Sequence, residues 1–281
     1  MQANPLAVDV SPQQLDRYAR LVYEKIGVTI SPQKITLLSN RLRRRLRARG
    51  LDCYDAYYEL LRRSPMADPE WEEFLQEITT HETYLFRDKL HWDWLRDTFV
   101  AELRAEQRAG TRRPTLRVWS AACSTGDEAA TIGCCLVDRL PSDWKIDILG
   151  TDVGSRAVEQ ARQATFGVRA MQLVPETYIR RFFEASDDGK SHTLKPAISG
   201  LMRFRVHNLL QPLHESQFDL IVLKNVLIYF DGASKRRVID QVRRALRPGG
   251  ILITGASDGA SEFLKDFESK HAWLHRLPVT A

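Results

Sequence analysis

A short turn near the middle of the chain carries two adjacent carboxylates where a helix is expected to begin. The apolar run Leu116–Ala122 leads into Cys123-Ser124-Thr125-Gly126-Asp127-Glu128, and a helical pattern follows over Glu128–Leu140. This order is typical of the first strand, turn and helix of an α/β sheet, where a ligand can approach the backbone closely. Asp127 and Glu128 would repel a dinucleotide pyrophosphate, which binds bare N–H groups at a helix N-terminus, but they would attract a cation.

The turn therefore favours a cationic cofactor over NAD. It lacks the G-x-G-x-x-G pattern of dinucleotide-binding turns. S-adenosylmethionine carries both an ammonium and a sulfonium group and suits an acidic turn better. The alternative is that Asp127 and Glu128 only complement the helix dipole. Asp152 follows the next predicted strand, Ile146–Thr151, where an acid is placed to bind ribose hydroxyls, unless it serves only the start of the following helix.

Two further groups of polar residues are candidates for the same site. Lys224-Asn225 follows the predicted strand Phe218–Lys224, so Asn225 and the nearby Tyr229 are expected on the ligand edge. Arg87 lies in the link between an N-terminal helical region and the sheet, and such links often form the wall of a cleft. Taken alone, an arginine such as Arg87 is more often an ordinary surface ion-pair residue.

These residues need a parallel sheet to bring them together. Strands alternate with helices from Leu116 onward, which predicts a doubly wound, mostly parallel α/β sheet. The expected strands are Leu116–Ala122, Ile146–Thr151, Phe204–His207, Phe218–Lys224 and Ile251–Gly255, and the expected helices are Glu128–Leu140, Ser155–Ala164 and Ser234–Leu246. Ala185–Ser191 reads as a hairpin turn or a loop within a less regular stretch.

The first 80 residues predict a small all-helical domain. Ser-Pro pairs open two helices and single glycines end them, as helix caps do. The expected helices run from Ser11 to Gly27, from Ser31 to Gly50, over Tyr54–Arg63 and from Asp68 onward, with a longer helix from an Asp88 cap to about Ala109. We expect domains at 1–80 and 111–281, a linker with the long helix at 81–110, and a small inserted β-subdomain near 170–203.

The second of these helices concentrates positive charge. Its apolar stripe is Ile35, Leu38, Leu42 and Leu46, which should leave Arg41, Arg44, Arg45 and Arg49 largely outside. The run has a single sign and no interleaved glutamate. It therefore favours a docking surface for an acidic partner, with a solvated basic face or phosphate contacts to a nucleic acid as the alternatives.

Composition bounds the remaining function classes. The chain has 281 residues, a net charge of +5, 43% hydrophobic and 27% charged residues, as in an ordinary globular protein. No apolar run approaches the ~20 residues that span a membrane, and the N-terminus has no signal-peptide pattern, so we expect a cytoplasmic protein without membrane insertion. Cys53, Cys123, Cys134 and Cys135 form no C-x-x-C pair, and we expect no metal.

Together the motifs resemble the chemotaxis receptor methyltransferases of the CheR family. That family has T-N-x-T-x-F-F-R, an A-x-S-T-G-E-E turn, an acid after the second strand, an N-L pair and R-N-V-x-I-Y-F-D. This chain has, in the same order and spacing, Thr80-His81-Glu82-Thr83-Tyr84-Leu85-Phe86-Arg87, Ala122–Glu128, Asp152, Asn208-Leu209 and Lys224–Asp231. The resemblance covers nearly the whole chain.

The resemblance implies an S-adenosylmethionine-dependent, Rossmann-like enzyme that methylates glutamate side chains on acidic helical cytoplasmic regions of chemoreceptors and releases S-adenosylhomocysteine. The cofactor-binding residues that it implies are His81, Thr83, Arg87, Ala122, Glu128, Asp152, Asn208, Leu209, Lys224 and Asn225. We expect Arg87 and Tyr229 to orient the reacting groups and the arginines of the basic helix to bind the receptor. We expect a monomer and no nucleic acid.

Three positions depart from the family pattern. His81 replaces an asparagine, Lys224 replaces an arginine, and Ala129 stands where the family often has proline. Lys224 keeps the positive charge but loses the two-pronged donor geometry of arginine. Two alternatives therefore stay open: a cofactor-binding signalling domain without catalysis, and a methyltransferase acting on RNA or a small molecule.

Overall fold

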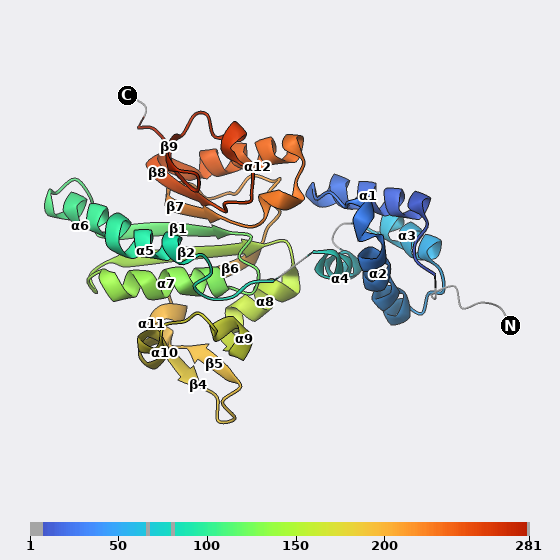
Figure 1. Ribbon diagram of the computed structural model, residues 1–281, viewed down its shortest axis with the longest axis horizontal. Helices are drawn as coiled ribbons and strands as arrows, with labels where there is room; N and C mark the ends of the chain where they lie inside the picture. The colour runs from blue at the N-terminus through green and yellow to red at the C-terminus, as the bar shows by residue number, and fades with distance from the viewer. Residues whose placement is uncertain (1–7, 66–67, 80–81, 280–281) are drawn as a thin grey trace. The chain divides into compact units, whose positions relative to one another are not determined.

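The computed structural model describes residues 8–65, 68–79 and 82–279, and the chain divides into two compact units (Figure 1). The first unit is the N-terminal region up to Thr80 together with Tyr229–Arg237. The second comprises His81–Ile228 and Val238–Ala281. The return of Tyr229–Arg237 to the first unit is not expected from the sequence.

The first unit contains the helices that the cap signals predict. They are α1 (Pro12–Ile26), η2 (Pro32–Lys34), α2 (Ile35–Arg49), α3 (Tyr54–Arg63) and α4 (Pro69–Ile78). Ser11 and Gln14 form the capping box at the start of α1, and Gly27 and Gly50 end α1 and α2 in the left-handed conformation. The apolar faces of the helices form a core that includes the buried Tyr18, Leu42 and Phe74.

The expectation that the arginines of α2 lie largely outside is wrong for Arg45. Its side chain is 11% exposed and forms ion pairs with Glu70 at 2.8 Å and Glu73 at 2.9 Å, both on α4. Arg41 is partly buried and donates to the Ile78 carbonyl. Acceptor groups on α4 draw these two arginines inward, because a buried guanidinium needs a carboxylate or carbonyl partner.

The segment Tyr229–Arg237 is joined to α1 and to the turn after it. The Tyr229 carbonyl accepts hydrogen bonds from the Thr29 amide at 2.8 Å and the Thr29 hydroxyl at 3.1 Å. Val28 and Phe230 form an antiparallel bridge. The Tyr23 hydroxyl donates to Asp231 at 2.9 Å. The loop that carries the I-Y-F-D motif is therefore part of the helical unit.

The second unit is built on a sheet with the strand order β6-β2-β1-β7-β8-β10-β9. Its parallel strands are β1 (Thr115–Ala121), β2 (Lys145–Asp152), β6 (Met202–Val206), β7 (Phe218–Leu223) and β8 (Leu246–Thr254). The strands β9 (Glu268–His271) and β10 (Leu274–Arg276) close one side antiparallel. The expected doubly wound, mostly parallel sheet is confirmed.

The crossover helices cover both faces of this sheet. The chain leaves β1 for β2 through α7 (Asp127–Arg139) and leaves β7 for β8, on the other side of β1, through α12 (Gly232–Ala245). Right-handed crossovers in opposite directions place their helices on opposite faces, as Figure 1 shows for the second unit. The point where the strand order reverses lies between β1 and β7, which is where such folds bind ligands.

The long helix expected after Asp88 is present but interrupted. It consists of α5 (Lys89–Trp94), a π-helical turn η3 (Leu95–Phe99) and α6 (Val100–Arg108). Asp88 is not the expected side-chain cap: it has φ 64° in the left-handed region and makes no cap hydrogen bond. Its carboxylate instead pairs with Lys224.

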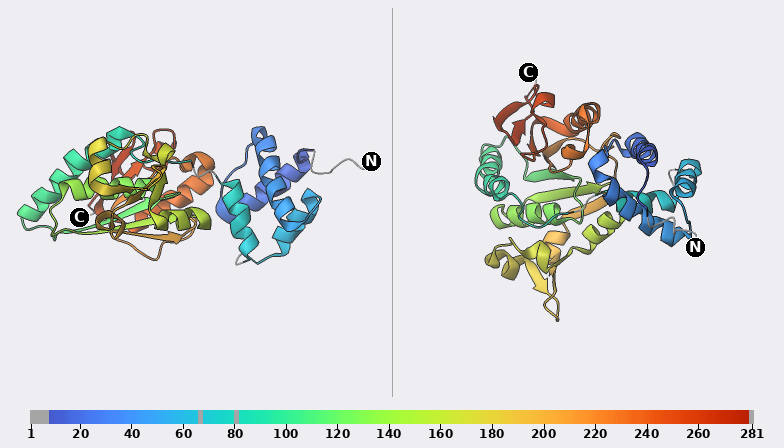
Figure 2. Two further views of the ribbon diagram at one scale, coloured as in Figure 1. Left: turned by 90° about the horizontal axis from the view of Figure 1, so that it is seen from below. Right: turned by 45° about the vertical axis from the view of Figure 1, so that its right-hand side comes forward.

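A small subdomain is inserted between β2 and β6, next to helix α8 (Ser155–Gln163). Its sheet has the order β3-β5-β4, from β3 (Thr165–Gly167), β4 (Phe183–Ala185) and β5 (Ser191–Leu194). Short helices α9 (Val168–Met171), α10 (Glu176–Phe182) and α11 (Pro196–Ser199) complete it. Residues 186–190 form the hairpin turn between β4 and β5, which projects from the unit in Figure 2.

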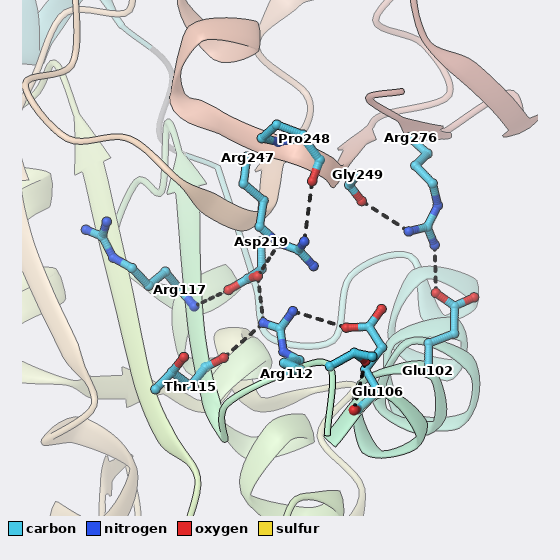
Figure 3. A network of polar contacts seen from close by, with 11 residues as sticks. Glu102, Glu106, Arg112, Thr115, Arg117, Asp219, Arg247, Pro248, Gly249 and Arg276 are labelled. Atoms are coloured by element: carbon cyan, nitrogen blue, oxygen red, sulfur yellow. Dashed lines mark hydrogen bonds and ion pairs between the residues drawn. The ribbon is translucent and has the colours of Figure 1, made fainter. Parts of the chain in front are cut away.

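A buried carboxylate fixes the edge of the sheet opposite the strand C-termini. Asp219, in the second position of β7, accepts from Arg112 at 2.6 Å, from Arg247 at 2.5 Å and from the Arg117 amide at 2.8 Å (Figure 3). Arg112 also donates to the Thr115 carbonyl. One carboxylate therefore ties the loop before β1 to β7 and β8.

Among the helices of the residues that the structure describes, none is both long and apolar enough to cross a membrane.

Candidate active site

The strand register brings the predicted polar residues to one edge of the sheet. Ala121, the last residue of β1, is level with Thr151 in β2 and Leu223 in β7, and Asp152 is level with Val206 in β6. The residues that follow these strands therefore emerge side by side. The sequence-predicted positions at this edge are Ala122, Glu128, Asp152, Asn208, Leu209, Lys224 and Asn225.

Asp152 is held by the backbone of two loops. Its side chain accepts from the Ser124 amide and from the Gly154 amide, both at 2.9 Å, and the residue is buried. Each carboxylate oxygen has a second lone pair, so these bonds orient the group without using all of its acceptor capacity. A carboxylate fixed in this way is suited to accept from a pair of ribose hydroxyls.

The turn after β1 requires an unusual backbone. Ala122, Ser124 and Gly126 have φ of 64°, 50° and 89°, all in the left-handed region. A Cβ at Gly126 would lie 2.9 Å from the Cβ of Ala161 in α8, so glycine is needed there both for φ and for space. The turn thereby packs closely against α8.

Glu128 is in the first turn of α7 and its side chain is 16% exposed. Its Oε1 accepts from the Ser120 hydroxyl at 2.7 Å, and its Oε2 lies 3.8 Å from the Lys224 ammonium. Burial raises the pKa of Glu128 above its ordinary value, and the charge of Lys224 opposes that rise. The neighbouring Asp127 is buried and accepts from Thr125 at 2.6 Å, so Glu128 is the acid left to face a cation.

The segment before α5 folds into a second turn against α7. The Phe86 amide donates to the Thr131 hydroxyl at 3.0 Å, and the Arg87 carbonyl accepts from the Trp92 indole at 2.6 Å. The guanidinium of Arg87 lies 5.6 Å from the ring centre of Tyr84, and Arg87 is partly buried. Thr83 is partly buried in the same segment, whereas His81 lies outside the described residues.

Lys224 and Asn225 begin the loop after β7. Lys224 is buried, and Asn225 has φ 59°. Asp258, from the turn after β8, accepts from the Asn225 amide at 2.9 Å and from the Gly255 amide at 2.7 Å. Burial raises the pKa of Asp258, while these backbone donors oppose the rise. Asp258 thus positions the loop that carries Asn225.

The pair after β6 combines a polar side chain with an apolar one. Asn208 is partly exposed and accepts from the Leu210 amide at 3.0 Å, and Leu209 is buried. His207 packs near Trp119, with ring centres 6.1 Å apart, and burial lowers its pKa to about 4. The imidazole is therefore neutral near pH 7.

Tyr229, expected together with Arg87, belongs to the first unit. Its ring lies 5.5 Å from the Lys34 ammonium, and its carbonyl is bonded to Thr29. Sequence reasoning missed Thr131, Ser120, Asp88 and Asp258 as supports of the site. Only Asp258 left a signal, because the last parallel strand ends in Gly255-Ala256-Ser257-Asp258, small residues before an acid.

The strand order, the acidic turn after β1 and the carboxylate after β2 define an S-adenosylmethionine-dependent methyltransferase. The residues present fit this cofactor, because a largely buried carboxylate, a backbone-oriented aspartate and an Asn-Leu pair lie along one strand edge.

The chain belongs to the CheR family. Residues 81–273 match the domain described as "CheR methyltransferase, SAM binding domain", and residues 13–79 match "CheR methyltransferase, all-alpha domain".

Curated relatives match over most of their length. Proteins named "Chemotaxis protein methyltransferase" are 28% identical in Salmonella typhimurium and 30% identical in Escherichia coli. Each alignment covers 95% of this chain, with 91% and 92% of the relative. "Chemotaxis protein methyltransferase 2" of Pseudomonas aeruginosa is 31% identical over 84% of this chain and 83% of its own. This chain is similar to these proteins in both of its domains.

The pKa of Glu128 predicts a pH-dependent cofactor affinity. An ordinary glutamate has a pKa of about 4.3. Because the pKa of Glu128 is raised, its carboxylate in the free protein takes up a proton at a higher pH than that. An ammonium group binds the ionised form, so the dissociation constant should rise as pH falls toward that pKa. Calorimetric titration with S-adenosylhomocysteine between about pH 8 and about pH 5 measures this. Glu128→Gln should flatten the dependence of the dissociation constant on pH. An equally steep dependence in that variant would show that Glu128 is not the group responsible.

Proposed function

We propose that this protein transfers the methyl group of S-adenosylmethionine to glutamate side chains on acidic helical cytoplasmic regions of chemoreceptors. The observation that carries the proposal is the match of both domains to one family whose curated relatives are named for chemotaxis. The all-helical domain matters most here, because it separates this family from methyltransferases that share only the sheet.

The chemistry asks little acid–base work of the protein. A glutamate with a pKa of about 4.3 is ionised near pH 7, so the acceptor needs no general base. The cofactor supplies an activated methyl group. The protein's own residues then have to align the acceptor carboxylate with that methyl group and exclude water, and opposite charges that cancel during transfer favour a dry site.

The site residues have distinct roles in this proposal. Asp152 binds the ribose, Glu128 faces the ammonium group, and Asn208 with Leu209 receives the adenine. Arg87 and Tyr229 orient the reacting groups. The other cofactor contacts in the proposal are His81, Thr83, Ala122 and Asn225.

The test is methyl transfer to a receptor fragment. The protein is incubated with S-adenosylmethionine labelled in its methyl group and with purified chemoreceptor cytoplasmic fragments, and the label is then treated with mild base. A carboxyl methyl ester is released by base, whereas N-methyl groups and 2′-O-methylated RNA keep the label. Cofactor binding without transfer to any fragment would favour a non-catalytic signalling domain, and base-stable label in RNA would favour an RNA methyltransferase.

We also propose that α2 helps to dock the receptor. Four arginines of this helix were predicted to contact the acidic partner: Arg41, Arg44, Arg45 and Arg49. Arg44 and Arg49 are 56% and 48% exposed, although Arg44 pairs with Glu77 and Arg49 lies 3.6 Å from Glu70. These two retain the exposure that a docking role needs, and the buried Arg45 contributes through the stability of the helix pair.

Reversing charge at Arg44 and Arg49 together should slow receptor methylation several-fold at low salt. Opposed charges mainly raise association rates, and salt screens the effect, so the variant should also lose most of its salt dependence. The measurement is the initial methylation rate across a salt series. Arg20→Glu is the control, an exposed arginine on α1 of the same unit. Equal rates for the double variant and wild type at low salt would make α2 a solvated basic face.

The same proposal places the protein in the cytoplasm, because its substrates are the cytoplasmic parts of receptors. We expect it to act there as a monomer. Sedimentation at micromolar concentration tests the oligomeric state. A dimer would contradict that part of the proposal and leave the methylation chemistry untouched.

A further inference from the structure

One buried lysine connects three elements of the sheet unit. The Lys224 side chain is 2% exposed, and its ammonium lies 3.1 Å from Asp88 Oδ2, 3.8 Å from Glu128 Oε2 and 3.4 Å from the Arg87 carbonyl. The ammonium also lies 4.7 Å from the ring centre of Trp92. The loop after β7 is thereby joined to the turn before α5 and to the first turn of α7.

The turn before α5 needs such a connection. Phe86 and Asp88 have φ of 59° and 64°, and a bulky residue such as phenylalanine rarely adopts that conformation without support. The supports are the Thr131 hydroxyl on the Phe86 amide, and Trp92 and Lys224 on the Arg87 carbonyl. Arg87, which lies between the two left-handed residues, is aimed by this turn.

The lysine also balances the charges around Glu128. Burial tends to raise the pKa of Asp88, but the Lys224 ammonium holds that pKa below its ordinary value. Burial raises the pKa of Glu128, with further contributions from the negative charges of Asp88 and Asp258, and Lys224 opposes all three. Burial and the same ammonium lower the pKa of His91 to about 4, so that imidazole is neutral near pH 7.

We propose that Lys224 is a positioning residue. Its buried ammonium ties Asp88 to Glu128, which holds the Arg87 turn in place and keeps the Glu128 carboxylate oriented toward the cofactor. The lysine is too enclosed by these partners to be the main cofactor contact and acts through them. The inference rests on the proposed placement of the cofactor ammonium at Glu128.

The first test compares Lys224→Met with Lys224→Arg by calorimetric titration with S-adenosylhomocysteine. Methionine keeps the apolar stem and removes the charge. We expect about a tenfold weaker affinity near pH 7 and a shift of the pH dependence to higher pH, because Glu128 loses its nearest cation. Arginine keeps the charge and should restore affinity to within about threefold. Lys265→Met, at an exposed lysine, is the control and should match wild type.

The variant Asp88→Asn should shift the pH dependence of cofactor binding in the direction opposite to Lys224→Met. Asp88 is partly exposed, so asparagine should be tolerated in the fold. Without the Asp88 charge, Glu128 is the remaining carboxylate paired with Lys224, and the repulsion between Asp88 and Glu128 is lost. Both changes lower the pKa of Glu128, so the pH dependence of cofactor binding should shift to lower pH. This variant also decides the matter if Lys224→Met does not fold.

A double-mutant cycle separates positioning from general stability. In the Glu128→Gln background, Lys224→Met should change the affinity much less than it does in wild type, because residues that act through one another are not additive. Equal effects in both backgrounds, or a Lys224→Met variant with the wild-type pH profile, would overturn the inference. Failure of the wild-type chain to bind S-adenosylhomocysteine would instead contradict the proposed cofactor site itself.

Discussion

Replacing Asp152 with asparagine is expected to weaken cofactor binding about ten- to hundredfold, which corresponds to the ~1.5–3 kcal/mol of a charge-assisted hydrogen bond. Asp152 accepts from the Ser124 and Gly154 amides. An asparagine has one carbonyl oxygen and would turn an N–H group toward one of these donors. The variant loses both the anionic acceptor for the ribose and the orientation of the turn. Calorimetric titration with S-adenosylhomocysteine measures the change.

Asp147→Asn is the matched control for this prediction. Asp147 lies in the same strand, β2, but away from its C-terminal end, and pairs with Arg203 at 2.7 Å and Arg117 at 3.3 Å. Its replacement removes an aspartate from β2 without touching the ligand edge. Cofactor affinity should therefore equal that of wild type. An equal loss in both variants would mean that any weakening of β2 impairs binding.

Replacing Asp219 with alanine is expected to destabilise the sheet unit by about 3–5 kcal/mol, the usual effect of removing one partner from a buried ion pair. The Asp219 side chain is 8% exposed and accepts from Arg112, Arg247 and the Arg117 amide. Its loss leaves the buried Arg112 short of a partner. A change of this size lowers Tm by about 6–20 °C in a unit of this length.

Differential scanning calorimetry checks this result against Asp266→Ala. Asp266 pairs with Arg243 at 3.0 Å, but both side chains are more than half exposed. Its loss should change stability by less than about 1 kcal/mol. If the two variants melt alike, the network in Figure 3 contributes no more than a surface ion pair.

Most helices and parallel strands were predictable because their signals are local. The capping box at Ser11 and the glycine caps at Gly27 and Gly50 are set by residues within one turn of each helix end. The strands around Asp152 alternate with helices in a pattern that only a parallel sheet accommodates. The ligand edge follows from that topology, because the ends of parallel strands coincide.

The failures come from partners that are distant in sequence. Asp88 precedes a helix and looks like an N-cap, yet its carboxylate pairs with Lys224, 136 positions later, and its backbone is left-handed. The arginines of α2 form a run of one sign, but the acids that pair with Arg45 are on α4. A charge run can be judged exposed only when the facing helix is known.

The return of Tyr229–Arg237 to the helical unit has the same cause. The I-Y-F-D motif follows β7 directly and reads as part of the sheet edge. Its backbone is held by Thr29 and Val28, in a turn that carries no marked signal for such pairing. Local patterns determine which residues gather at the ends of the strands, but not which unit a connecting loop joins.

The central claim, that the cofactor lies along this strand edge, is tested most directly by a crystal structure of the protein with S-adenosylhomocysteine. We predict that the ribose hydroxyls donate to Asp152, that the ammonium group faces Glu128 and that the adenine lies beside Asn208 and Leu209. Lys224 should keep its contacts with Asp88 and Glu128. A ligand bound elsewhere, or bound here with Asp152 paired only to Ser124 and Gly154, would contradict the account.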